Sequence, residues 1–135
     1  MSIKQIATIV GSISKDSINM EIARFMQNRY QKKMAIEILP LNDIPLYNRD
    51  IELTPPAIIK RYRQTIREAD GLLLITPEYN HSIPGVLKNA LDWFSRVDQV
   101  LQGKPTMILG ATPGGLGTVK AQIHLRQILN SGGLG

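Results

Sequence analysis

Three short loops hold the residues of this sequence that could bind a charged or flat ligand. The first loop, residues 11–19 (GSISKDSIN), lies between an apolar run and a helical pattern. Free N–H groups and the positive end of a helix dipole favour an anion at such a place. Its side chains add donors and one positive charge: Ser12, Ser14, Ser17, Asn19 and Lys15. This loop predicts a phosphate site, while a plain helix N-cap at Ser17 would account for one serine.

The other two loops are shaped by proline and glycine. The second loop, residues 76–82 (TPEYNHS), follows the apolar run 72–75, and the third loop, residues 111–117 (ATPGGLG), follows the run 106–111. Proline stiffens a turn, and glycine lets the backbone approach a ligand closely. The first loop has neither the Gly-Lys-Ser/Thr ending of a P-loop nor the spaced glycines of a dinucleotide fingerprint. Together the three loops favour a mononucleotide that carries a flat ring.

Alternating strands and helices position these loops. Strands are expected at 3–10, 35–39, 72–75 and 106–111, and helical patterns follow near 22–30, 55–69, 86–97 and 121–129. This alternation predicts an α/β fold with an open parallel sheet and helices on both faces, a three-layer α/β/α arrangement. In the flavodoxin-like strand order, the ends of the first, third and fourth strands are neighbours, and ligands bind beyond such ends.

Composition is that of one globular domain spanning residues 1–135. Cysteine is absent, and His81 and His124 lack metal-ligand spacing, so no metal site is expected. The net charge of +5 has three readings: nucleic-acid binding, a solvated helix face, or attraction of an anionic small molecule. The basic residues are scattered except for one predicted helix with Lys60, Arg61, Arg63 and Arg67, without aromatic stacking residues, which favours a solvated face over nucleic acid. No membrane segment is expected, and the expected location is cytoplasmic.

The motifs resemble those of the NADPH-dependent FMN reductase family, nearest to its chromate, quinone and azo-dye reductases. The block TPEYNHSIPGVLKNALDW is the most specific match, and GSISKDSIN and GKPTMILGATPGGLGTVKAQIHLRQIL extend it over nearly the whole chain. The resemblance implies a flavodoxin-like fold with FMN as cofactor. It places the FMN phosphate on Ser12, Ser17 and Asn19, with Lys15 near it and Ser14 in the same loop.

For the ring, the resemblance implies contacts from the second and third loops. The residues are Pro77, Glu78, Tyr79, Asn80, His81 and Ser82 on one side, and Thr112, Pro113, Gly114 and Gly115 on the other. Pro77 could instead only shape a turn, and Glu78 could be a solvated loop charge. None of these residues is expected to be catalytic, because the flavin itself carries the chemistry.

The resemblance further implies an NAD(P)H oxidoreductase. NADPH or NADH would pass a hydride to FMN, and the electrons would go by a ping-pong cycle to a quinone, an azo compound, a metal oxyanion or free flavin. The alternatives are a non-enzymatic flavodoxin-like electron carrier and a flavin-binding module. The basic balance of charge argues against the carrier, whose surface is typically acidic.

The helix at 86–97 carries two apolar stripes, and a surface helix needs one to face its own sheet. The second stripe includes Val86, Ala90, Trp93 and Val97. We therefore expect it, and Trp93 in particular, to lie in a homodimer or dimer-of-dimers interface; burial within one subunit is the alternative. The long loop 40–48 between two predicted elements either lines the ligand site or only connects them.

A flavodoxin-like sheet has a fifth strand and a closing helix, and neither fits before Gly135. The fourth strand would then be an exposed apolar edge. We expect a longer natural polypeptide, with roughly 40–50 further residues that supply one strand and one helix.

Overall fold

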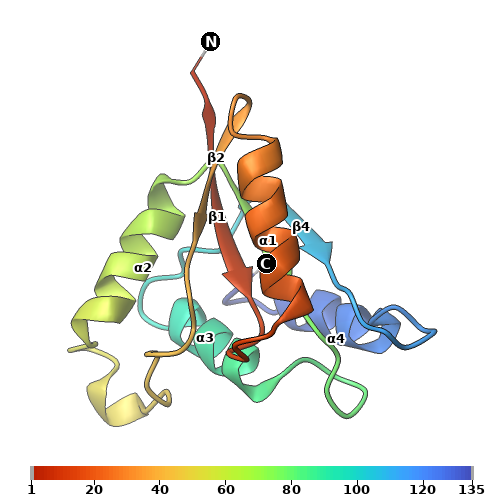
Figure 1. The fold of residues 1–135 in the computed structure, drawn as a ribbon. Helices are drawn as coiled ribbons and strands as arrows, with labels where there is room; N and C mark the ends of the chain where they lie inside the picture. Colours follow the sequence, from red (N-terminus) through yellow and green to blue (C-terminus); the bar gives the residue numbers. More distant parts are fainter. Residues whose placement is uncertain (1, 135) are drawn as a thin grey trace.

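The computed structural model describes residues 2–134 and contains one parallel sheet. Its strands are β1 (Lys4–Val10), β2 (Met34–Ile38), β3 (Gly71–Ile75) and β4 (Thr106–Leu109). They are ordered β2-β1-β3-β4, which confirms the flavodoxin-like topology (Figure 1). All five residues of β3 are buried because the strand lies inside the sheet and is covered on both faces. The uniformly apolar run in the sequence therefore marked the centre of the fold.

Helices cover both faces of the sheet, as predicted. They are α1 (Ile18–Arg29), α2 (Ala57–Glu68), α3 (Gly85–Ser95) and α4 (Val119–Leu129), with a short 3-10 turn, η1 (Arg49–Ile51). The buried apolar residues of α2, α3 and α4 share one core with Ile9 and Leu74, whereas α1 packs on the other face against Val10 and Ile75 (Figure 1). No helix within residues 2–134 combines the length and hydropathy that a membrane crossing requires.

Strand β4 lies at the edge of the sheet within residues 2–134, as the sequence predicts. Thr106 and Met107 are exposed, and Met107 is 55% solvent-accessible. The expected strand and helix beyond Gly135 lie outside the described residues.

The prediction for Trp93 is wrong. Its side chain is 0% exposed, and the indole Nε1–H donates to the carbonyl of Pro45 at 2.8 Å. The ring of Tyr47 meets it edge-on, with centroids 5.3 Å apart. The chain's own loop after β2 therefore covers Trp93, which belongs to the core of the subunit, whereas Val97 of the same predicted stripe lies beyond the end of α3 and is 60% exposed.

Asn89 holds the same loop from α3. Its amide donates to the carbonyl of Pro45 at 2.9 Å and accepts from the N–H of Tyr47 at 2.7 Å. A further bond, from Asn42 Nδ2 to the carbonyl of Ile13 at 3.5 Å, reaches the first loop. The loop after β2 thus acts mainly as a structural cover for α3 and touches the predicted site only at its beginning.

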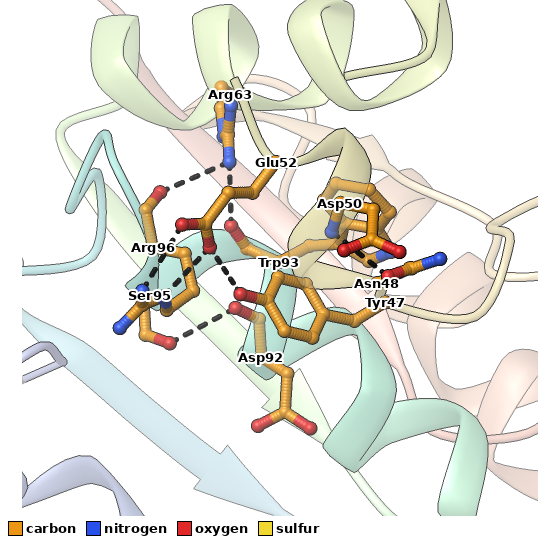
Figure 2. A network of polar contacts seen from close by, with 9 residues as sticks. All are labelled: Tyr47, Asn48, Asp50, Glu52, Arg63, Asp92, Trp93, Ser95 and Arg96. Carbon is orange, nitrogen blue, oxygen red and sulfur yellow. Dashed lines mark hydrogen bonds and ion pairs between the residues drawn. The ribbon is translucent and has the colours of Figure 1, made fainter. Parts of the chain in front are cut away.

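A polar network closes the far end of α3 (Figure 2). Arg96 donates from Nε and a terminal nitrogen to the two carboxylate oxygens of Glu52, at 3.0 and 3.2 Å, and the Tyr47 hydroxyl donates to the same carboxylate. Hydrogen bonds from Arg96 and then from Tyr47 lower the pKa of Glu52 to about 2. The bond to Glu52 raises the pKa of Tyr47.

Arg63 departs from the predicted solvated face of α2. Its side chain is buried and donates to the carbonyls of Trp93 and Arg96, at 2.8 and 3.1 Å, as Figure 2 shows. These carbonyls lie at the C-terminal end of α3, where the helix dipole favours a cation. Lys60, Arg61 and Arg67 are exposed, so the prediction of a solvent-exposed basic helix face holds for three of the four residues.

Glu52→Gln should destabilise the protein most above pH 5 and progressively less as the pH falls. The carboxyl titrates at about 2 when folded and near its ordinary value of 4.5 when unfolded, so its ion pair stabilises the fold above that ordinary value. This stability is lost as the pH falls toward 2, where a protonated Glu52 resembles glutamine. Urea unfolding at several pH values measures the difference, with the exposed Glu68→Gln as control. A difference that is independent of pH would contradict the network.

Candidate functional site

The register of the sheet brings the three loops to one edge. Val10 pairs with Ile75, and Ile75 pairs with Leu109, so three strands end side by side. The ladder continues one residue further, since Gly11 N donates to Ile75 O at 2.8 Å and Thr76 N donates to Leu109 O at 2.9 Å. The first, second and third loops therefore start next to one another, as predicted.

The serine hydroxyls of the first loop keep their protons available. Ser12 Oγ accepts from the N–H of Ser14 at 3.2 Å, Ser14 Oγ from Asp16 at 3.4 Å, and Ser17 Oγ from Met20 at 3.1 Å. A hydroxyl that accepts in this way can still donate its own hydrogen. Ser17 is indeed the N-cap of α1, but the cap leaves its donor free.

The start of α1 supplies further donors. Among residues 2–134, the N–H groups of Ile18 and Asn19, the first two of the helix, have no hydrogen-bond acceptor. Lys15 is exposed and lies three positions before the helix in the sequence. Two free backbone donors, three hydroxyl protons and one ammonium group suit a phosphate dianion.

The second loop is a tight hairpin. Tyr79 and Ser82 exchange backbone hydrogen bonds of 2.9 and 3.0 Å, and both central residues, Asn80 and His81, have positive φ values of 51° and 67°. This is the pattern of a type I′ turn, which usually contains glycine. Pro77 precedes the hairpin, and Tyr79 is half exposed at its base.

Three residues of the second loop contact α4. Glu78 Oε1 accepts from the N–H of Ala121 at 2.9 Å. His81 Nδ1 lies 3.2 Å from Lys120 Nζ, and Ser82 Oγ lies 2.9 Å from His124 Nδ1. The predicted residues Glu78, His81 and Ser82 are therefore joined to the helix that follows the third loop.

The third loop is open to solvent. Thr112, Pro113, Gly114 and Gly115 are all exposed, and the only hydrogen bond among these four within residues 2–134 runs from Gly114 N to Thr112 Oγ1 at 3.2 Å. Neither glycine has a neighbour that would fill its Cβ position closely: the nearest atom to that of Gly114 is 3.6 Å away. A flat ring could approach this backbone.

The Asn19 side chain, which was expected to bind the phosphate, bonds to the backbone of the third loop. Its Nδ2 donates to the carbonyl of Ala111 at 3.1 Å, and its Oδ1 accepts from the N–H of Ala111 at 2.9 Å. The side chain is buried and points toward the third loop. One Nδ2 hydrogen remains for another acceptor.

Gly110 and Thr118, which border the third loop, are residues that sequence reasoning missed. A Cβ at Gly110 would lie 2.0 Å from Thr118 Oγ1 and 2.6 Å from the carbonyl of Thr76. Thr118 is buried and has a positive φ of 63°, which is unusual for a β-branched residue. The glycine itself was the available signal, because a glycine at the end of an apolar strand often marks close backbone approach.

The model of the NADPH-dependent FMN reductase family matches residues 5–134. The chain belongs to this family. It is 44% identical over 129 residues to a quinone reductase of Escherichia coli K12, covering 93% of this chain and 69% of the relative. It is 42% identical over 126 residues to a 2-hydroxy-1,4-benzoquinone reductase of a Burkholderia species, covering 92% and 69%.

A solved structure agrees with the fold. FerB, a flavoenzyme NAD(P)H:(acceptor) oxidoreductase from Paracoccus denitrificans, superposes with a TM-score of 0.88 at 36% identity, over 94% of this chain and 71% of FerB. The family confirms FMN and NAD(P)H as cofactor and electron donor, and quinone or FMN reduction as the class of activity. The donor chemistry of the first loop fits a flavin phosphate. Among residues 2–134, no cluster of three or more potential metal ligands occurs.

Proposed function

We propose that the protein reduces quinones with NADPH or NADH through FMN bound across the three loops. The observation that supports this most is the strand register, which places one donor-rich loop beside two loops with accessible backbone. The chemistry that FMN supplies when bound is hydride acceptance from NAD(P)H, followed by transfer of the electrons to an acceptor in a ping-pong cycle. The names of the relatives favour a quinone over an azo compound, a metal oxyanion or free flavin.

The residues of the chain bind and orient in this proposal. Ser12, Ser17 and the start of α1 donate to the phosphate, with Ser14 and Lys15 at its outer side. Backbone N–H groups of the second loop offer hydrogen bonds to the polar rim of the ring and stabilise negative charge that develops there. Gly114 and Gly115 leave room for the ring on the other side. The bound flavin can exchange protons with solvent on this side, because residues 112–117 are exposed.

Turnover separates this proposal from an electron carrier or a simple flavin-binding module. The purified protein should show the absorption spectrum of oxidised FMN and should oxidise NADPH steadily when a quinone is present. Binding of FMN without steady NADPH oxidation would contradict the reductase. A ping-pong cycle predicts parallel double-reciprocal lines when the NADPH and quinone concentrations are varied, whereas intersecting lines would contradict it.

Ser12→Ala should weaken FMN binding roughly tenfold to a hundredfold, because a donor to a charged acceptor contributes about 1.5–3 kcal/mol. Riboflavin, which lacks the phosphate, should bind the variant and the wild type equally. Fluorescence titration measures both dissociation constants, with the exposed Ser131→Ala as control. Unchanged FMN affinity in Ser12→Ala would place the phosphate elsewhere.

Assembly and location belong to the same proposal. A homodimer or dimer of dimers through the α3 region is now supported only by exposed apolar side chains at its margins, such as Val97 and Leu46, since Trp93 is covered. Dependence on NAD(P)H supports a cytoplasmic location.

A further inference from the structure

The third loop is held at its first residue by a side chain from another loop. Asn19 makes two hydrogen bonds with the backbone of Ala111, 92 residues away, and its side chain retains only 3% of its exposure. Such a pair of bonds fixes one peptide much as a neighbouring strand would. The strand ladder has ended by this point, because β4 stops at Leu109. The position of Ala111 therefore depends on Asn19.

The third loop is also held where it enters α4. Thr118 occupies the N-cap position in a left-handed conformation and makes no capping hydrogen bond. Ala121, the third residue of the helix, has the N–H that an N-cap side chain normally serves. Glu78, in the second loop, accepts from this N–H at 2.9 Å and adds a negative charge at the positive end of the helix dipole. The cap of α4 thus comes from 43 residues away.

Between these two attachments, residues 112–117 are exposed and contain three glycines. Few internal bonds define this segment, so its course depends on the two fixed ends. We propose that Asn19 and Glu78 are positioning residues, which act on the flavin by holding the third loop rather than by touching the flavin. This inference rests on the proposed function. It assigns both residues a role different from the direct contacts that the family resemblance implies.

The chemistry of each side chain favours this assignment. The oxygen and one hydrogen of the Asn19 amide are already bonded to Ala111, so at most one donor remains for a ligand. A carboxylate at Glu78 would repel a phosphate and a negatively charged ring, whereas it stabilises a helix N-terminus. Each side chain therefore does more for the loop than it could do for the ligand.

The comparison of FMN with riboflavin distinguishes the two roles. A direct phosphate ligand affects FMN alone, whereas a residue that positions the ring loop affects both flavins by the same factor. We expect Asn19→Ala and Glu78→Ala each to raise the dissociation constants of FMN and riboflavin about equally, by roughly fivefold to thirtyfold, because each removes one or two hydrogen bonds. Asn28→Ala, on the exposed side of α1, and Glu68→Ala, on α2, are matched controls and should leave both constants unchanged.

Hydrogen exchange of the flavin-free protein gives a second readout. The N–H of Ala111 should exchange at least tenfold faster in Asn19→Ala, and the N–H of Ala121 should do so in Glu78→Ala. Glu78→Gln keeps an oxygen acceptor and should preserve most of the protection at Ala121. Circular dichroism shows whether Asn19→Ala folds. If it does not fold, Asn19→Asp replaces it in this test, because aspartate keeps the acceptor for the N–H of Ala111. It should preserve protection at Ala111.

Three results would overturn the inference. The first is loss of FMN affinity with unchanged riboflavin affinity in Asn19→Ala, which would make Asn19 a phosphate ligand. The second is unchanged affinity for both flavins, and the third is unchanged exchange at Ala111 and Ala121. A wild-type protein that binds neither flavin would instead refute the proposed function itself.

Discussion

Trp93→Ala should lower the free energy of unfolding by about 3–5 kcal/mol, the range for removing a large buried aromatic side chain. Trp93 is fully buried, and its Nε1–H bonds to Pro45 at 2.8 Å. The substitution leaves a cavity between α3 and the loop after β2, and it leaves the carbonyl of Pro45 with Asn89 as its remaining donor. Urea unfolding followed by circular dichroism measures the loss.

Two further variants make this test specific. Trp93→Phe retains most of the packing and should cost less than the alanine variant. Phe25→Ala removes an aromatic side chain that is 64% exposed on α1 and should change stability by less than about 1 kcal/mol. A stable Trp93→Ala variant that changes only its oligomeric state would contradict burial within the subunit.

The misplacement of Trp93 shows where sequence reasoning reaches its limit. The two apolar stripes of α3 are read from helical periodicity and are buried at Leu87, Leu91 and Phe94 and at Ala90 and Trp93, whereas Val97 lies beyond the end of the helix and is 60% exposed. What the pattern does not show is which segment buries the second stripe. Residues 40–48 look like a connector because they lack any periodicity, yet Pro45 and Tyr47 cover Trp93 from 48 and 46 positions away in the sequence. Contacts of this range depend on how strands are ordered, and periodicity reports only local structure.

The fold itself was predictable from the sequence because each strand is rich in apolar residues and each helix follows a turn signal. Gly71–Ile75 is wholly apolar, and α1 begins at Ile18, four residues before the expected helical pattern, with Ser17 as the N-cap that the sequence offered as an alternative. The three ligand loops follow from this alternation, because parallel strands end at one edge.

The roles of individual side chains in those loops were less predictable. In the sequence, Asn19 and Glu78 lie in polar loops that could bind a ligand. Only the folded structure shows that they bond instead to the backbone of Ala111 and Ala121. Arg63 is a similar case, since its spacing on α2 matches exposed lysine and arginine, while α3 happens to end beneath it. A polar side chain serves whichever backbone group lacks a partner nearby, and the sequence does not identify that group.

Gly110→Ala should destabilise the protein by at least about 2–3 kcal/mol and should abolish tight FMN binding. The added Cβ would lie 2.0 Å from Thr118 Oγ1 and 2.6 Å from the carbonyl of Thr76, and carbon atoms do not approach so closely. Thr76 begins the second loop and Thr118 ends the turn before α4. Relief of the clash must therefore displace two of the three ligand loops. Thermal unfolding and fluorescence titration with FMN measure the two effects, and Gly132→Ala, whose Cβ has no neighbour within 4 Å, is the control.

A second substitution separates the two contacts at Gly110. Thr118→Gly removes the Oγ1 atom and also the cost of a β-branched residue at a φ of 63°, which glycine adopts freely. Added to Gly110→Ala, it should recover part of the stability but not all of it, because the carbonyl of Thr76 belongs to the backbone and remains 2.6 Å from the new Cβ. Full recovery would mean that the threonine side chain alone excludes a larger residue at position 110. Wild-type stability and FMN affinity in the single Gly110→Ala variant would contradict the close approach of the loops.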